Sequence, residues 1–170
     1  MLIINHRVNS ITQLISVPFD HGAEIDIRYH NNDLIIDHDP FEHQIKNPEL
    51  LSNFLEHWKH SGPLILNLKT EGIEEECISL MSIFKIKNWF FLDMSMPFLV
   101  RYSLIANNEG SNILPRNLAV RFSEYEPIEY ALSFSGKAHW VWVDCFNELP
   151  LNLDNYKKLK NAGFKICIVS

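Results

Sequence analysis

The chain has 170 residues, of which 46% are hydrophobic and 21% charged, the proportions of an ordinary soluble globular protein. The formal net charge is −6, and no run of Lys or Arg interrupts this acidic balance, so we expect no nucleic-acid partner. Residues 1–10 lack a basic leader, and no apolar stretch approaches the ~20 residues of a membrane-spanning helix. We therefore expect a cytoplasmic protein without membrane insertion.

Short apolar runs recur along the chain, separated by stretches long enough for a helix. They predict strands at residues 2–5, 23–28, 64–68, 89–93, 117–122, 139–143 and 164–169. Helices are expected between them, at residues 10–17, 48–60, 73–84, 97–107, 127–133 and 152–162. Pro48, Pro97 and Pro127 fall where a first helical turn tolerates proline. Asn152 is a candidate N-cap, and Gly163 stands where a glycine would end the last helix.

The alternation of strands and helices implies βα units and a parallel sheet. Seven strands in this order favour an α/β fold of the parallel (β/α) TIM-barrel type. A complete barrel has eight strands and usually ~200–250 residues, so we expect a small and incomplete one. A doubly wound open sheet is the alternative. Without repeats or a linker, residues 1–170 are expected to form a single domain, and an open barrel edge could pair two copies into a homo-oligomer.

The second predicted strand carries charge where a barrel strand should be apolar. Glu24, Asp26 and Arg28 share one face, because side chains alternate along a strand. Two carboxylates that point toward a barrel centre would repel each other and lose hydration unless a cation sits between them. Mg²⁺ and Ca²⁺ prefer such oxygen ligands. The alternative is an edge strand of an antiparallel sheet with a solvated polar face.

The third predicted strand repeats this pattern at its carboxyl end, where active sites of parallel barrels gather. Asn67 and Lys69 share a face, so the Asn67 oxygen could be a third metal ligand and the Lys69 ammonium could meet a phosphate. Arg121 follows the apolar residues 118–120 and could complement an anionic ligand. The alternative at each position is a strand that runs out into a solvated loop.

Two histidines stand where strands end. His6 follows the first strand, and His38 follows the apolar residues 34–36 with an aspartate on either side. Phosphodiester cleavage needs a base to activate the nucleophile and an acid to protonate the departing alkoxide, and two histidines meet that need near neutral pH. Arg7 could hold non-bridging phosphate oxygens.

The order of these residues resembles the glycerophosphodiester phosphodiesterase family, to which phosphatidylinositol-specific phospholipases C are related. The matching positions, in chain order, are His6-Arg7, Glu24-x-Asp26, His38-Asp39 and Asn67-x-Lys69. Residues 152–169, a helix followed by a glycine and an apolar strand, resemble the family's seventh unit. The resemblance spans nearly the whole chain, and its specific motifs lie in the first 70 residues.

The resemblance implies a TIM barrel that cleaves phosphodiesters of glycerol or a similar polyol to a phosphomonoester and an alcohol. It implies His6 and His38 as the acid/base pair and a divalent metal ion on Glu24 and Asp26. Arg7 and Lys69 would contact the substrate phosphate. The substrate would be a small molecule.

The sequence departs from the family pattern at two of these motifs. Asn67 stands where the family has its third acidic ligand, and a neutral ligand should weaken metal binding. Val8 replaces the glycine that usually follows His-Arg. A catalytically weak or inactive barrel that binds a phosphate ligand is therefore the alternative.

Three cysteines, Cys77, Cys145 and Cys167, lie far apart in apolar surroundings. They form no CxxC pair, so we expect buried free thiols in a reducing compartment.

Overall fold

The computed structural model describes residues 2–39 and 48–168. The chain divides into two compact units, Met1–Phe90 and Phe91–Ser170. The expectation that residues 1–170 form a single domain stays a prediction. In the described ranges, no helix is long and apolar enough to cross a membrane.

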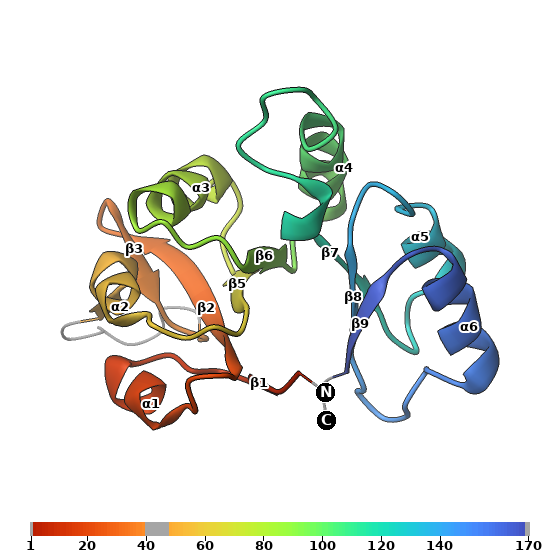
Figure 1. Cartoon of the computed structure of the whole chain (residues 1–170), viewed down its shortest axis with the longest axis horizontal. Coiled ribbons are helices and arrows are strands. Elements are labelled where there is room, and N and C mark those ends of the chain that lie inside the picture. The colour runs from red at the N-terminus through yellow and green to blue at the C-terminus, as the bar shows by residue number, and fades with distance from the viewer. Residues whose placement is uncertain (1, 40–47, 169–170) are drawn as a thin grey trace. The chain divides into compact units, whose positions relative to one another are not determined.

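The first unit is built on a parallel core with an antiparallel extension. Its strands are β1 (Ile4–Asn5), β2 (Gly22–His30), β3 (Asp33–Ile36), β4 (Glu49–Leu50), β5 (Leu64–Leu68) and β6 (Trp89–Leu92), the last of which continues to the start of the second unit. They lie in the order β4-β3-β2-β5-β6, and β1 also pairs with β2. Helices α1 (Ile11–Ser16), α2 (Leu51–His57) and α3 (Glu74–Ile83) lie on one side of these strands (Figure 1).

Strand β2 is the central strand of this unit. Along one edge it pairs in parallel with β5, from Ala23 to Ile27. The other edge is shared, because β1 pairs in parallel with its beginning and β3 pairs antiparallel with its end. Ala23, Ile25 and Ile27 are fully buried, as expected for an apolar strand face covered by helices.

The second unit contains three parallel strands in the order β7-β8-β9. These are β7 (Ala119–Phe122), β8 (Trp140–Val143) and β9 (Lys165–Ile168); the helices are α4 (Met96–Ile105), the 3₁₀ turn η1 (Pro115–Asn117), α5 (Ile128–Leu132) and α6 (Leu153–Asn161). Helices α5 and α6 lie on the same side of the three strands (Figure 1). A single parallel bridge joins Phe91 to Leu118.

All seven predicted strands and all six predicted helices are present, which confirms the α/β class with parallel strands. The strand pairs of residues 2–39 and 48–168 form a six-stranded and a three-stranded sheet, and these do not join into one closed barrel. The Asn152 side chain caps α6 by accepting a hydrogen bond from Asn155 N at 2.8 Å. Gly163 follows that helix with φ of 90°, which a residue with a side chain adopts only at a cost.

Several expectations need correction. Pro48 does not open a helix, because the chain first forms β4 and α2 begins at Leu51. Strands β3 and β4 were not predicted as strands; β3 coincides with the short apolar run at residues 34–36, and β4 has only two residues. The three cysteines are free, as expected, but Cys145 is exposed and only Cys77 and Cys167 are buried.

Candidate functional site

Two carboxylates lie in the interior of the first unit. Glu24 and Asp26 on β2 have no exposed surface. The register of the parallel pair places Asp26 beside Asn67 of β5, and paired residues of parallel strands point to the same face. The predicted shared face of polar side chains is therefore confirmed, and the edge-strand alternative is wrong, because β2 is paired along both edges.

Burial governs the protonation of Glu24. Desolvation, and then the nearby charge of Asp26, raise the pKa of Glu24 to about 7. Hydrogen bonds from Arg7 N at 2.7 Å and from Asn67 Nδ2 at 2.7 Å favour the charged form but do not offset this rise. Near neutral pH the metal-free Glu24 is therefore divided between its two protonation states, and a cation beside it would favour the carboxylate.

Asp26 is held by two side chains from other elements. Asn9 Nδ2 donates to Asp26 Oδ2 at 2.8 Å, and Asp26 N donates to Asn9 Oδ1 at 3.0 Å. Lys69 Nζ lies 3.4 Å from Asp26 Oδ1. The amide clamp of Asn9 was not expected from the sequence, and only its place directly after His6-Arg7-Val8 could have suggested it.

The residues suit a divalent metal ion in their chemistry. Asp26 Oδ1 and Asn67 Oδ1 are buried and accept no hydrogen bond within the described part of the chain, although Lys69 Nζ lies 3.4 Å from Asp26 Oδ1. The two carboxylates and the amide oxygen of Asn67 therefore offer a set of oxygen ligands. Buried acceptors of this kind are costly unless something satisfies them, and hard cations prefer oxygen ligands. In the described residues no three His, Cys, Asp or Glu side chains come together in this way; the third ligand here would be an amide.

The strand pairing brings the two segments that carry the predicted histidines to the level of the buried carboxylates. After β1, Val8 N bonds to Glu24 O at 2.8 Å; after β3, Asp37 N bonds to Asp26 O at 3.0 Å. Both segments therefore reach the same edge of β2. The hairpin of β2 and β3 is essential for this arrangement. It reverses the chain after His30, so that the end of β3 returns to the level of the two carboxylates.

His6 and Arg7 occupy the segment that follows β1. His6 Nε2 lies 3.6 Å from Glu24 Oε2, and the histidine side chain is 43% exposed. Arg7 is exposed and adopts a left-handed backbone with φ of 56°, a conformation that costs energy for a residue with a side chain. This conformation accompanies the bond from Arg7 N to Glu24, so the backbone of Arg7 helps to hold the carboxylate.

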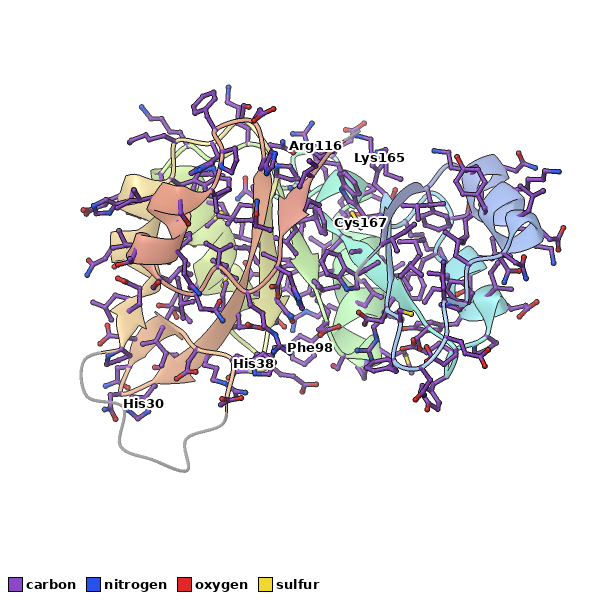
Figure 2. The ribbon with its side chains drawn as sticks, turned by 90° about the horizontal axis from the view of Figure 1, so that it is seen from below. His30, His38, Phe98, Arg116, Lys165 and Cys167 are labelled. Atoms are coloured by element: carbon purple, nitrogen blue, oxygen red, sulfur yellow. The ribbon has the colours of Figure 1, made fainter. Side chains whose placement is uncertain are left out.

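His38 occupies the segment that follows β3, and Figure 2 labels it together with His30, the last residue of β2 in the same hairpin. His38 Nδ1 lies 2.8 Å from Asp39 Oδ1, so the expected carboxylate partner is present. This bond from His38 lowers the pKa of Asp39. A histidine fixed through one ring nitrogen presents the other for proton transfer.

Arg28 connects the segments around the site, a role that the sequence did not indicate. Its guanidinium donates to His38 O at 2.8 Å and to Lys69 O at 3.4 Å. It therefore ties the end of the β3 segment to the end of β5. The alternation of side chains along β2 correctly placed Arg28 on the face of Glu24 and Asp26, but it did not predict which groups Arg28 contacts.

Arg121 lies in the second unit and is surrounded by carboxylates. It contacts Glu126 at 3.0 Å, Asp93 at 3.3 Å and Asp144 at 3.7 Å. A guanidinium with three carboxylate neighbours is poorly suited to attract an anion. The expectation that Arg121 binds the substrate phosphate stays a prediction that its surroundings do not favour.

Metal-free protein should lose stability as the pH rises from about 4.5 to about 7. The pKa of Glu24 is raised to about 7 in the folded state. Over this pH range the folded state therefore binds the Glu24 proton more tightly than the unfolded state does. The free energy of unfolding should therefore fall by about 3 kcal/mol. Urea unfolding in the presence of a chelator measures this change. The Glu24→Gln variant should show a much flatter profile, and an unchanged profile in that variant would assign the effect to another group.

The comparisons with known proteins bear on the fold. No protein-family model matches this chain, and no curated protein matches its sequence. Among solved structures it is similar to a glycerophosphodiester phosphodiesterase from Agrobacterium tumefaciens strain C58, with a TM-score of 0.68 and 15% sequence identity over 98% of this chain and 86% of that chain.

The protein is thus a mixed α/β protein with parallel strands. Its fold is similar to that of the glycerophosphodiester phosphodiesterase from Agrobacterium tumefaciens. At this identity the likeness concerns the fold alone.

Proposed function

We propose that the protein hydrolyses a small glycerol- or sugar-linked phosphodiester in a metal-dependent reaction. The observation that carries this proposal is the buried pair Glu24 and Asp26, which share one face of the sheet with Asn67 and Lys69. A buried pair of carboxylates is costly unless positive charge compensates both members, and Lys69, 3.4 Å from Asp26 Oδ1, carries a single positive charge. The likeness to a glycerophosphodiester phosphodiesterase supports phosphodiester hydrolysis as the class of reaction.

Glu24, Asp26 and Asn67 would hold the metal ion, Mg²⁺ or Ca²⁺. Such an ion neutralises charge that develops on phosphate oxygens. Lys69, which is 21% exposed beside Asp26, would add a positive charge for a non-bridging oxygen of the phosphate. The exposed guanidinium of Arg7 would bind a second such oxygen.

His6 and His38 would move the protons. One imidazole would take a proton from the attacking water as the water oxygen bonds to phosphorus, and the other would give a proton to the departing alkoxide as its bond to phosphorus breaks. His38, whose ring is fixed by Asp39, suits the role of the acid. His6, which is next to Glu24, suits the role of the base.

Several further expectations belong to this proposal. The two units would together form a TIM-type barrel, like the barrel that the sequence resemblance implies. The protein would act in the cytoplasm on a small molecule, without nucleic acid and without insertion into a membrane. An edge strand could pair two copies into a homo-oligomer.

A second candidate is a catalytically weak or inactive barrel that binds a phosphate ligand. Asn67 favours it, because its Nδ2 donates to Glu24 Oε1 at 2.7 Å and so engages an oxygen that a metal ion would need. Rotation of the amide would turn its oxygen toward the site instead. The two candidates therefore differ in whether a metal ion displaces this bond.

The experiment is an assay of the alcohol released from glycerophosphodiesters in the presence of Mg²⁺ or Ca²⁺. We expect turnover that a chelator abolishes and that the Asp26→Asn variant loses. The His57→Gln variant, changed at an exposed position of α2, is the matched control and should retain activity. Phosphate binding by calorimetry without any turnover, in folded protein, would favour the inactive barrel.

A further inference from the structure

Arg28 lies two residues beyond Asp26 on the face of β2 that carries both buried carboxylates. Its guanidinium reaches two other segments of the first unit. It donates to the main-chain carbonyl of His38, after β3, at 2.8 Å, and to that of Lys69, after β5, at 3.4 Å. A guanidinium presents its donors in a rigid planar fork, so Arg28 sets the distance between these two segments.

The side chain of Arg28 is held by these two carbonyl bonds. Its Nε is buried and has no hydrogen-bond partner among the described residues. Its charge also acts on the neighbourhood of His38: the bond from His38 is the main cause of the lowered pKa of Asp39, and the charges of Arg7 and Arg28 contribute to it. The guanidinium is therefore fixed close to both His38 and the aspartate that holds the His38 ring.

His38 stands where the chain leaves the sheet. Strand β3 ends at Ile36, and Asp37 N bonds to β2 at 3.0 Å. The next residue, His38, makes two bonds of different kinds: its ring bonds to Asp39, and its carbonyl accepts from Arg28. The bond to Asp39 joins neighbours of one segment and fixes only the direction of the ring. The bond from Arg28 joins His38 to β2, the strand of the carboxylates.

Lys69 depends on Arg28 much less than His38 does. Lys69 N donates to Ile27 O at 2.9 Å, which continues the pairing of β5 with β2. Lys69 Nζ lies 3.4 Å from Asp26 Oδ1. The bond from Arg28 to the Lys69 carbonyl is long, at 3.4 Å, and long hydrogen bonds are weak. Loss of the guanidinium should therefore release His38 and leave Lys69 in place.

We propose that Arg28 is the positioning residue of His38. The guanidinium holds the His38 carbonyl at a fixed distance from β2, so that the imidazole keeps its place relative to Glu24 and Asp26. Arg28 acts through His38 and not on the substrate. A displacement of about 1 Å in a reacting group costs about a hundredfold in rate, so this anchor should matter to turnover. The inference rests on the proposed phosphodiester hydrolysis and assigns that site a further residue.

The first test needs no turnover. Backbone order parameters of the full chain are measured by ¹⁵N relaxation in the parent and in the Arg28→Gln variant. The amides of His38 and Asp39 should fall from about 0.85 to below about 0.6, whereas the amide of Lys69 should not change and so reports an intact fold. The Arg116→Gln control, which removes a cation from an exposed position of η1, should leave all three unchanged. A flexible His38 in the parent, or an unchanged His38 in Arg28→Gln, would overturn the proposal.

The second test is a double-mutant cycle in the glycerophosphodiester assay. Arg28→Gln should lower kcat about 10- to 100-fold and leave KM within about twofold of the parent. In the His38→Gln background the same substitution should cost less than about twofold, because Arg28 acts through His38.

The Arg28→Lys variant separates position from charge. Lysine keeps the positive charge but lacks the planar fork, so this variant should lose as much kcat as Arg28→Gln does. Additive losses in the cycle, or full activity in Arg28→Lys, would overturn the positioning role. An inactive parent would instead count against the proposed hydrolysis, and the order parameters of His38 would then decide the role of Arg28 alone.

Discussion

The His38→Gln and His6→Gln variants are each expected to lose about 10²- to 10⁴-fold in turnover of a glycerophosphodiester. The reason is positional, since both histidines stand on segments that bond to the same edge of β2, one at Glu24 and one at Asp26. Glutamine keeps hydrogen-bonding capacity but cannot exchange a proton near neutral pH. Steady-state kinetics at saturating metal ion measure the loss.

The two variants should differ in their dependence on pH. Loss of the base removes the limb of the rate profile at low pH, and loss of the acid removes the limb at high pH. The His30→Gln variant is a suitable control, because His30 ends β2 in the same hairpin that leads to His38 (Figure 2). It should retain the parent rate. Full activity in either the His6 or the His38 variant would exclude that histidine from proton transfer.

The alternation of residues along each strand predicted which side chains of that strand share a face. The alternation of β2 placed Glu24 and Asp26 on one face, and the same rule placed Asn67 with Lys69; the register of β2 and β5 then brings Asp26 and Asn67 side by side. Strand alternation is a local property that depends only on backbone geometry. This explains why it could be derived without any knowledge of the fold.

Contacts between segments could not be derived in this way. Asn9 is separated from Asp26 by 17 residues, and Arg28 from Lys69 by 41, so neither pair leaves a periodic signal. The clearest case is Arg121, which the sequence presents as a cation that ends an apolar run. Its three carboxylate neighbours come from three other segments. The guanidinium of Arg121 therefore contacts carboxylates of the protein, whereas the sequence suggested an anionic ligand.

The Asn67→Asp variant is expected to have two large effects of opposite sign. In metal-free protein it removes the bond from Asn67 Nδ2 to Glu24 and adds a third buried carboxylate beside Glu24 and Asp26. Uncompensated buried charge costs about 3–5 kcal/mol, so the unfolding free energy should fall by an amount of this order at pH 8. Urea unfolding with a chelator measures it.

With a divalent metal ion the same substitution should be favourable. A third carboxylate strengthens the attraction for Mg²⁺ or Ca²⁺ by on the order of ten- to a hundredfold, because affinity at such sites follows the number of charged ligands. Saturating metal ion should therefore restore most of the lost stability, since a ligand that binds only the folded state stabilises it. The matched control is Asn53→Asp, an exposed position on α2, which should change neither quantity.

The outcome separates the two candidate functions. If Asn67 contributes a weak ligand to a working centre, Asn67→Asp should raise metal affinity and leave turnover within about tenfold of the parent. If the parent is an inactive barrel because Asn67 engages Glu24, the variant should gain metal-dependent turnover that the parent lacks. A variant that loses stability but gains no metal affinity would show that Glu24, Asp26 and residue 67 do not share an ion.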